Sequence, residues 1–146
     1  MEKISKNISE TEKIAEEFLK NILNKKNKNA IVVGLYGDLG VGKTAFTQVI
    51  GKILKIKRKI NSPTYVIIKS YPIGKISDFK LLIHIDAYRL KNEKELLHLG
   101  WEELISKPEN LIFIEWPELV IKAMPKKHHK IEIFHTKEGY RKFKIN

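Results

Sequence analysis

Near the start of the chain, the pattern of apolar positions is typical of an amphipathic helix. Over 9–24, apolar side chains recur at spacings of three and four residues, which places them on one helix face. They are Ile14, Phe18, Leu19, Ile22 and Leu23. Ser9 is expected to cap this helix, because Glu12 follows at the spacing of a capping box. We therefore expect a helix that covers a core, followed by a polar loop over 25–29.

Short apolar runs bounded by turn residues predict strands. The runs 30–36 and 111–115 are almost continuously apolar, as in strands that are buried on both faces of a sheet. Segments 64–71 and 80–86 predict two more strands. Because the connection over 72–79 is too short for a crossover helix, these two strands are expected to be antiparallel neighbours.

A glycine-rich motif lies between the strand at 30–36 and a helical pattern that runs from Lys43 to about Leu54. It is a full match to the phosphate-binding pattern G-x-x-x-x-G-K-[ST] and comprises Gly37, Asp38, Leu39, Gly40, Val41, Gly42, Lys43 and Thr44. Its glycines let backbone N–H groups wrap an anion, and the following helix adds the positive end of its dipole. Lys43 is expected to reach the β and γ phosphates, and the Thr44 hydroxyl to bind Mg²⁺.

The order of these elements predicts an α/β fold. Short helices are expected over 92–99 and 102–105, and edge strands over 131–134 and 141–145. A strand, a phosphate loop and a helix followed by further strands and helices make a single P-loop NTPase-like domain over residues 1–146. Its sheet is expected to be mixed parallel and antiparallel and flanked by helices.

Two acidic residues end apolar strands of this predicted sheet. Asp86 follows 81–85, and Glu115 follows 111–114. In α/β folds, the carboxyl ends of the strands line the ligand crevice. Hydrolysis at a phosphate loop needs a carboxylate for the Mg²⁺ shell and a group that orients the attacking water. We expect the two acids to fill these roles, and their spacing leaves open which acid does which.

Residues beside the acids allow more than one interpretation. Thr64 occupies the region where GTPases place a switch threonine, although Asn61 to Thr64 is equally a Ser-Pro turn that enters a strand. His84 alternates with two isoleucines and is interpreted as a residue of a sheet face rather than a metal ligand. Arg89 stabilises phosphate charge or pairs with an acid, and Trp116 is either a core residue or a lid over the site.

Composition adds limits on function and location. The 146 residues are 42% hydrophobic and 31% charged, which is ordinary for a globular protein. The formal charge of +11 attracts polyanions, but it does not by itself establish contact with nucleic acid. The absence of cysteine excludes disulfide partners and thiolate chemistry. Since no apolar run approaches the ~20 residues of a membrane span and no signal peptide is visible, the expected location is the cytoplasm, away from any membrane.

Four motifs in this order resemble the TsaE family, also called YjeE. They are Gly37 to Thr44, Ser62-Pro63-Thr64, His84-Ile85-Asp86-Ala87-Tyr88-Arg89-Leu90 and Ile114-Glu115-Trp116-Pro117. The resemblance extends from about Ser9 to Arg141, and its last three motifs are far more specific than the phosphate loop. It implies a small bacterial ATPase that hydrolyses ATP to ADP with Mg²⁺, weakly when alone. Such proteins support formation of N6-threonylcarbamoyladenosine at position 37 of tRNAs that read codons starting with A.

The resemblance also implies partners. In this family the ATPase works with TsaB and TsaD, and TsaD transfers the threonylcarbamoyl group. Contact with tRNA is therefore expected to be indirect, through these proteins.

Matching positions carry the family's catalytic roles onto this sequence. Lys43 would bind phosphate, Thr44 would bind Mg²⁺, and Asp86 and Glu115 would form the acidic pair around metal and water. Val41 stands where the family often has Ala, a change that removes no phosphate ligand.

The same comparison implies nucleotide contacts outside the loop. Thr64 would be the switch-like residue, Trp116 would lie near the nucleotide, and Thr11 and Arg141 would lie near the adenine. The lysine-rich segment 52–59 has no clear counterpart in the family.

Two other functions remain open at this level. A small-molecule or nucleotide kinase uses the same loop, although the sequence has few arginines and no lid-like segment. The second is a nucleic-acid or protein-binding module in which ATP is only a ligand. The absence of the guanine-recognising pattern Asn-Lys-x-Asp favours ATP over GTP only indirectly.

Overall fold

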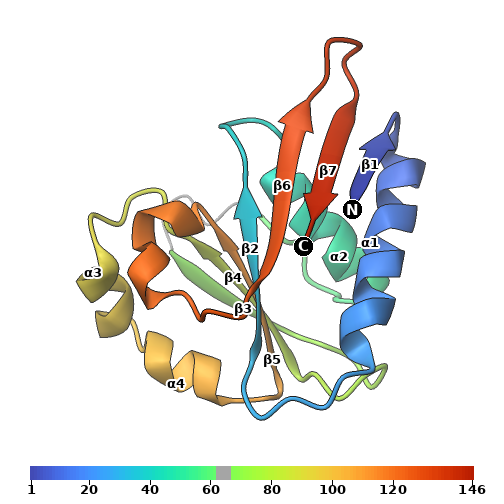
Figure 1. The fold of residues 1–146 in the computed structure, drawn as a ribbon. Helices are drawn as coiled ribbons and strands as arrows, with labels where there is room; N and C mark the ends of the chain where they lie inside the picture. Colours follow the sequence, from blue (N-terminus) through green and yellow to red (C-terminus); the bar gives the residue numbers. More distant parts are fainter. Residues whose placement is uncertain (62–66) are drawn as a thin grey trace.

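The computed structural model describes residues 1–61 and 67–146, and these form a mixed sheet with the strand order β1-β7-β6-β2-β5-β4-β3 (Figure 1). The strands are β1 (Glu2–Ser5), β2 (Ile31–Tyr36), β3 (Ile68–Pro72), β4 (Leu81–Asp86), β5 (Asn110–Glu115), β6 (His129–His135) and β7 (Arg141–Ile145). The four central strands β6, β2, β5 and β4 are parallel, whereas β1, β7 and β3 pair antiparallel at the two sides. The predicted antiparallel pairing of the strands before and after 72–79 is confirmed.

Helices cover both faces of this sheet. They are α1 (Ile8–Leu23), α2 (Lys43–Ile53), α3 (Glu93–His98), α4 (Trp101–Ser106) and the 3₁₀ helix η1 (Pro117–Ala123). Helices α1 and α2 pack on one face, and α3, α4 and η1 pack on the other. Val33 and Phe113 point into the first core, while Val32 and Ile112 point into the second. Two-sided burial explains the continuous apolar runs of β2 and β5, and the predicted α/β fold with flanking helices is confirmed.

The predicted cap of the first helix was wrong. Helix α1 begins at Ile8 and is capped by Asn7, whose side chain accepts the N–H of Glu10 at 2.9 Å. Ser9 therefore lies inside the first turn, and Glu12 forms an ion pair with Lys52 in place of a capping box.

The C-terminal strands are not edge strands. Strand β6 lies between β2 and β7, and β7 is covered by β1, a four-residue strand that the sequence pattern did not reveal. Four residues are too few to show an alternation of apolar and polar positions. The position of β1 is set instead by its pairing with β7. Helix η1 was also not predicted.

Part of the predicted strand over 64–71 falls on residues 62–66, so Thr64 lies outside the described residues. Within the described ranges, none of the helices is both long enough and apolar enough to cross a membrane.

Candidate nucleotide-binding site

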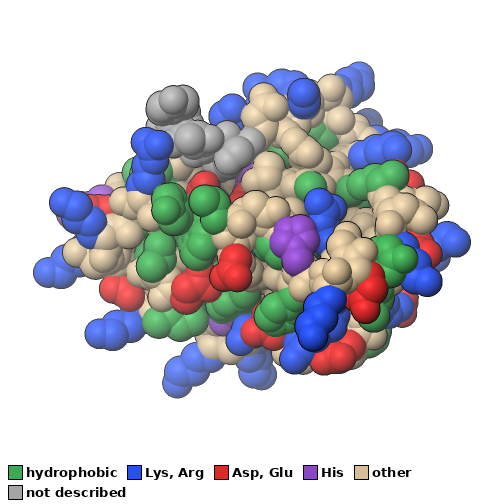
Figure 2. Space-filling view, turned by 90° about the horizontal axis from the view of Figure 1, so that it is seen from above, with side chains coloured by type: hydrophobic (Ala, Val, Ile, Leu, Met, Phe, Trp, Pro, Cys, Tyr) green, Lys and Arg blue, Asp and Glu red, His purple; other side chains and the backbone are tan. Residues whose placement is uncertain are grey.

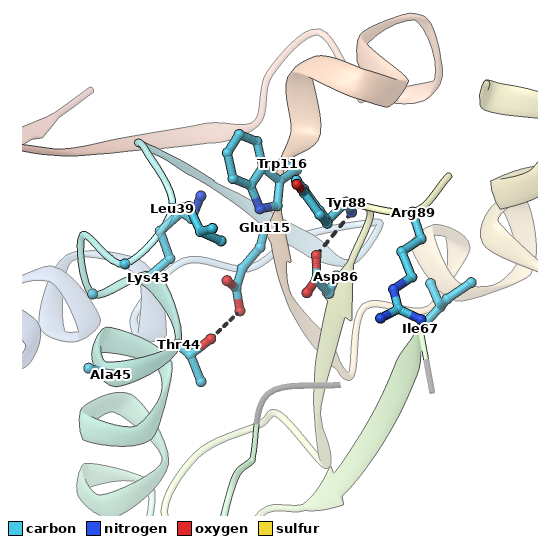
Figure 3. Close-up of a pocket in the computed structure, with 12 residues that line it drawn as sticks. Leu39, Lys43, Thr44, Ala45, Ile67, Asp86, Tyr88, Arg89, Glu115 and Trp116 are labelled. Carbon is cyan, nitrogen blue, oxygen red and sulfur yellow. Dashed lines mark hydrogen bonds between the residues drawn. The ribbon is translucent and has the colours of Figure 1, made fainter. Parts of the chain in front are cut away.

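A pocket of about 370 Å³ lies where the carboxyl ends of β4 and β5 face the N-terminus of α2 (Figure 3). The predicted site residues that line it come from the glycine loop, α2 and both strand ends. They are Leu39, Gly40, Gly42, Lys43, Thr44, Asp86, Glu115 and Trp116. The parallel register of β4 and β5 sets Asp86 directly opposite Glu115. The structure therefore brings the two acids and the loop together, as the sequence predicted.

The loop backbone takes a shape that requires glycine. Gly37 and Gly42 have φ values of 147° and 109°, in the region that side chains disfavour. A Cβ on Gly37 would also lie 2.6 Å from the carbonyl oxygen of Ile133. Val41 is buried beneath the loop and anchors it to the core, while Gly37, Asp38 and Val41 belong to the loop without lining the pocket. The loop is thus held closely against the sheet, and Leu39, Gly40 and Gly42 line the pocket.

Lys43 is enclosed at the first turn of α2. Its Nζ donates a hydrogen bond of 2.5 Å to the Gly37 carbonyl and lies 3.4 Å from the centre of the Trp116 ring. The residue is only 4% exposed. Burial lowers the pKa of Lys43, and nearby carboxylates, Glu115 most strongly, oppose this shift. Among the described residues Lys43 forms no ion pair, and an anion bound in the loop would supply a close counter-charge.

Glu115 is held from two sides. The Thr44 hydroxyl donates to its Oε2 at 2.8 Å, and His84 Nε2 lies 2.6 Å from the same oxygen. Glu115 is 4% exposed and His84 is completely buried. Sequence reasoning placed His84 on a sheet face, which is correct, but it missed the contact with Glu115. The available signal was the two-residue spacing between His84 and Asp86, which puts both on the same face of β4.

Asp86 is less constrained than Glu115. Its Oδ1 accepts the backbone N–H of Tyr88 at 3.0 Å, a turn contact directly after the strand. Burial raises the pKa of Asp86, the Tyr88 N–H partly offsets this, and the charge of Glu115 adds to the rise. The carboxylate of Asp86 is therefore a stronger base than an ordinary aspartate.

Trp116 lines the pocket and lies over Lys43. It follows β5 with φ 58° and ψ 45°, a left-handed conformation that is uncommon for a residue with a large side chain. Pro117 then begins η1, and the Trp116 ring packs against Tyr88 with centroids 5.1 Å apart. Trp116 packs against the second core as well as lining the pocket, so its role as a lid stays a prediction.

Thr11 and Arg141 do not line this pocket. Thr11 is buried and its hydroxyl lies 2.6 Å from that of Ser5, the residue that pairs with Arg141 between β1 and β7. The Arg141 guanidinium packs against the loop, since a Cβ on Gly42 would come within 3.0 Å of it. Arg141 thus lies against the phosphate loop and Thr11 lies against Ser5 of β1, and the contact of both residues with adenine stays a prediction.

The oxygen donors of the pocket fit Mg²⁺ in the presence of phosphate. Thr44, Glu115 and Asp86 offer a hydroxyl and carboxylates, which are the hard ligands that this ion prefers. Among the described residues, no three His, Cys, Asp or Glu side chains are grouped so as to hold a metal ion. Mg²⁺ is ordinarily bound by one or two carboxylates together with substrate phosphates. The residues present therefore suit a magnesium–nucleotide pair better than a metal ion alone.

Comparisons with known proteins identify related sequences and a related structure. Proteins named "tRNA threonylcarbamoyladenosine biosynthesis protein TsaE" are similar in sequence. The one from Bacillus subtilis is 38% identical over 102 residues, which cover 70% of this chain and 60% of that protein. The one from Rickettsia felis is 38% identical over 118 residues, covering 80% of this chain and 63% of that protein. The matched part thus spans about three fifths of the length of these curated relatives.

The crystal structure of Bacillus subtilis YdiB superposes with a TM-score of 0.76 and 28% identity, covering 99% of this chain and 83% of that one. The family model for "Threonylcarbamoyl adenosine biosynthesis protein TsaE" matches residues 5–143. Together with the curated relatives and the structural match, this family match shows that the chain belongs to the TsaE family.

Proposed function

We propose that this protein is a Mg²⁺-dependent ATPase that supports the threonylcarbamoyl modification of adenosine 37 in tRNAs reading ANN codons. One observation carries the proposal: a phosphate loop, a buried lysine and a threonine–glutamate pair converge on a single pocket. The names of the curated relatives supply the pathway.

The charged and hydroxyl-bearing residues named above have roles in this reaction that follow from their positions. The N–H groups of the loop and Lys43 hold the β and γ phosphates of ATP. Thr44 and Glu115, which are already hydrogen-bonded to each other, hold Mg²⁺. The ion, when bound, neutralises charge that develops on the phosphates. Asp86, the freer and more basic acid, orients and deprotonates the attacking water.

The contacts of the Lys43 ammonium group explain why the isolated chain would hydrolyse ATP slowly. Its ammonium is engaged by the Gly37 carbonyl and by the face of Trp116, so a phosphate must displace these contacts. Leu39 and Tyr88 at the pocket rim are 76% and 52% exposed, which offers apolar contact area to a partner. We infer that TsaB and TsaD act here, and that ATP hydrolysis changes their contact with this chain.

Direct tRNA binding is not part of the proposal. On the face seen in Figure 2, Lys and Arg side chains lie mainly around the periphery and do not gather into one basic patch. A charge-driven tRNA contact would weaken steeply with salt. Following the resemblance, we propose that the tRNA is held by the partners, and the relatives' names do not favour the kinase alternative.

Isothermal titration with ATP tests the phosphate site. Lys43→Ala should weaken binding by roughly 10- to 150-fold, because a hydrogen bond to a charged group contributes about 1.5–3 kcal/mol. Lys52→Ala is the matched control, since Lys52 lies on the same helix with a side chain that is 75% exposed and paired with Glu12. Equal ATP affinity in wild type and Lys43→Ala would contradict the proposal.

The pathway assignment has its own test. Pull-downs with TsaB and TsaD, with and without ATP, should recover the chain in a nucleotide-dependent way. Recovery that ignores ATP would argue against a role for hydrolysis in this contact.

A further inference from the structure

We propose that His84 is a positioning residue, which fixes the Glu115 carboxylate in the orientation that the magnesium–nucleotide pair requires. The inference rests on the proposed function, because it assigns a supporting residue to the same site. His84 itself reaches neither the loop nor the pocket, so it acts only through Glu115.

The contact between the two residues is short and fully enclosed. His84 Nε2 lies 2.6 Å from Glu115 Oε2, and the exposed fractions of the two side chains are 0% and 6%. A carboxylate can only accept hydrogen bonds, so Nε2 is the donor. In the described part of the chain, His84 Nδ1 has no hydrogen-bond partner. A hydrogen on Nε2 and none on Nδ1 is therefore the arrangement that leaves no buried N–H unpaired.

Packing alone does not account for a histidine at this place. The neighbouring positions of β4 that share its burial are Leu82, Ile83 and Ile85, all apolar and completely buried. A buried polar group with an unpaired nitrogen costs free energy that an aliphatic side chain would not. The hydrogen bond that compensates this cost goes to the acid of the site.

The second hydrogen bond on Glu115 shows what His84 controls. Thr44 and His84 both donate to Oε2, so they hold that oxygen from α2 and from β4. Within the described residues, Oε1 has no hydrogen bond and remains available to a ligand. The terminal torsion of a glutamate is soft. Without His84, Thr44 alone would hold the carboxylate, and the two oxygens would no longer have fixed roles.

Substitutions of His84 by side chains of different length and polarity can show whether it positions Glu115 or only fills space in the core. Gln can place an amide N–H near the position of His Nε2, Asn is polar but too short, and Leu has no donor. The first readout is the magnesium increment, meaning the ratio of ADP affinities with and without Mg²⁺ by titration calorimetry. The second is kcat for ATP hydrolysis in the presence of TsaB and TsaD.

We expect His84→Leu and His84→Asn to reduce both the magnesium increment and kcat by roughly 10- to 100-fold, the usual effect of losing a residue that supports a metal ligand. Metal-free ADP affinity should stay the same, and His84→Gln should recover most of the loss. Leu82→Val is the control for packing, because Leu82 lies on the same face of β4 and is completely buried. This variant should lower Tm while keeping both readouts.

Three results would overturn the inference. One is a folded His84→Leu protein with a normal magnesium increment and kcat. Another is equal impairment of His84→Gln and His84→Asn. The third is a loss that follows Tm in all variants, including Leu82→Val. If the wild type binds ADP but hydrolyses no ATP, the proposed function fails, and the magnesium increment still decides the role of His84.

Discussion

Asp86 and Glu115 stand opposite each other at the ends of two adjacent parallel strands, but their surroundings differ. Glu115 receives hydrogen bonds from two side chains, one on α2 and one on β4. Asp86 accepts a backbone N–H of its own turn and is more exposed. The same position in the sheet thus yields one fixed and one adaptable carboxylate.

This difference divides the two chemical tasks that the sequence left open. A metal ligand benefits from a fixed orientation, and Glu115 is tied to Thr44, the other residue expected to bind Mg²⁺. A general base benefits from a pKa closer to the working pH, and burial raises that of Asp86. We therefore propose that Glu115 binds the metal ion and that Asp86 orients the attacking water.

The largest effect is expected from Glu115→Gln. Gln keeps the size and an acceptor oxygen but removes the negative charge, so the magnesium increment in ADP affinity should disappear. Hydrolysis should fall by at least about 100-fold, the scale of losing one electrostatic contact in a transition state. Titration calorimetry and a phosphate-release assay measure the two quantities. A Glu115→Gln protein that keeps the magnesium increment would remove Glu115 from the metal shell.

Asp86→Asn should slow hydrolysis by about 100-fold, since positioned general bases contribute roughly 10²–10⁴. Unlike Glu115→Gln, it should leave the magnesium increment nearly intact. Its pH profile gives a second readout. Wild-type kcat should fall as pH drops through the raised pKa of Asp86, because protonation removes the base.

In Asp86→Asn the residual activity should lack this acid limb, as Asn does not titrate. If Asp86→Asn loses the magnesium increment and Glu115→Gln keeps it, the two roles are exchanged.

Sequence patterns were sufficient for features that depend on local order. The phosphate loop and the two acids were predicted, because a strand end and a helix start are fixed by neighbouring residues. Their meeting at one pocket follows from parallel strands in register. The mixed sheet followed from strand runs and connection length.

Features that depend on long-range pairing were missed. Strand β1 exists because it pairs with β7 from the other end of the chain, and this pairing makes β7 an internal strand. The contact between His84 and Glu115 joins residues 31 positions apart, and each of them alone fits an ordinary strand. The side chain of Arg141 also lies against Gly42. The fold brings these distant residues together, and no local sequence pattern predicts the contact.

The smallest expected effect is on the free energy of unfolding. Replacing Asp86 should raise stability, whereas replacing Glu115 should lower it. The pKa of Asp86 is raised in the folded state, so the folded protein binds this proton more tightly than the unfolded chain does. The ionised carboxylate therefore costs stability above the raised pKa, and this cost vanishes below the unfolded pKa. Asp86→Asn should raise stability at neutral pH by roughly 0.5 kcal/mol, which corresponds to about 1–2 °C in Tm.

Thermal unfolding at neutral and at acidic pH measures this gain, which should shrink as pH falls. Glu115→Gln provides the contrast, because the ionised carboxylate accepts hydrogen bonds from His84 and Thr44. Since hydrogen bonds to charged groups contribute about 1.5–3 kcal/mol, weakening them should lower Tm at neutral pH. If both variants shifted Tm by the same amount in the same direction, the proposed difference between the two carboxylates would be wrong.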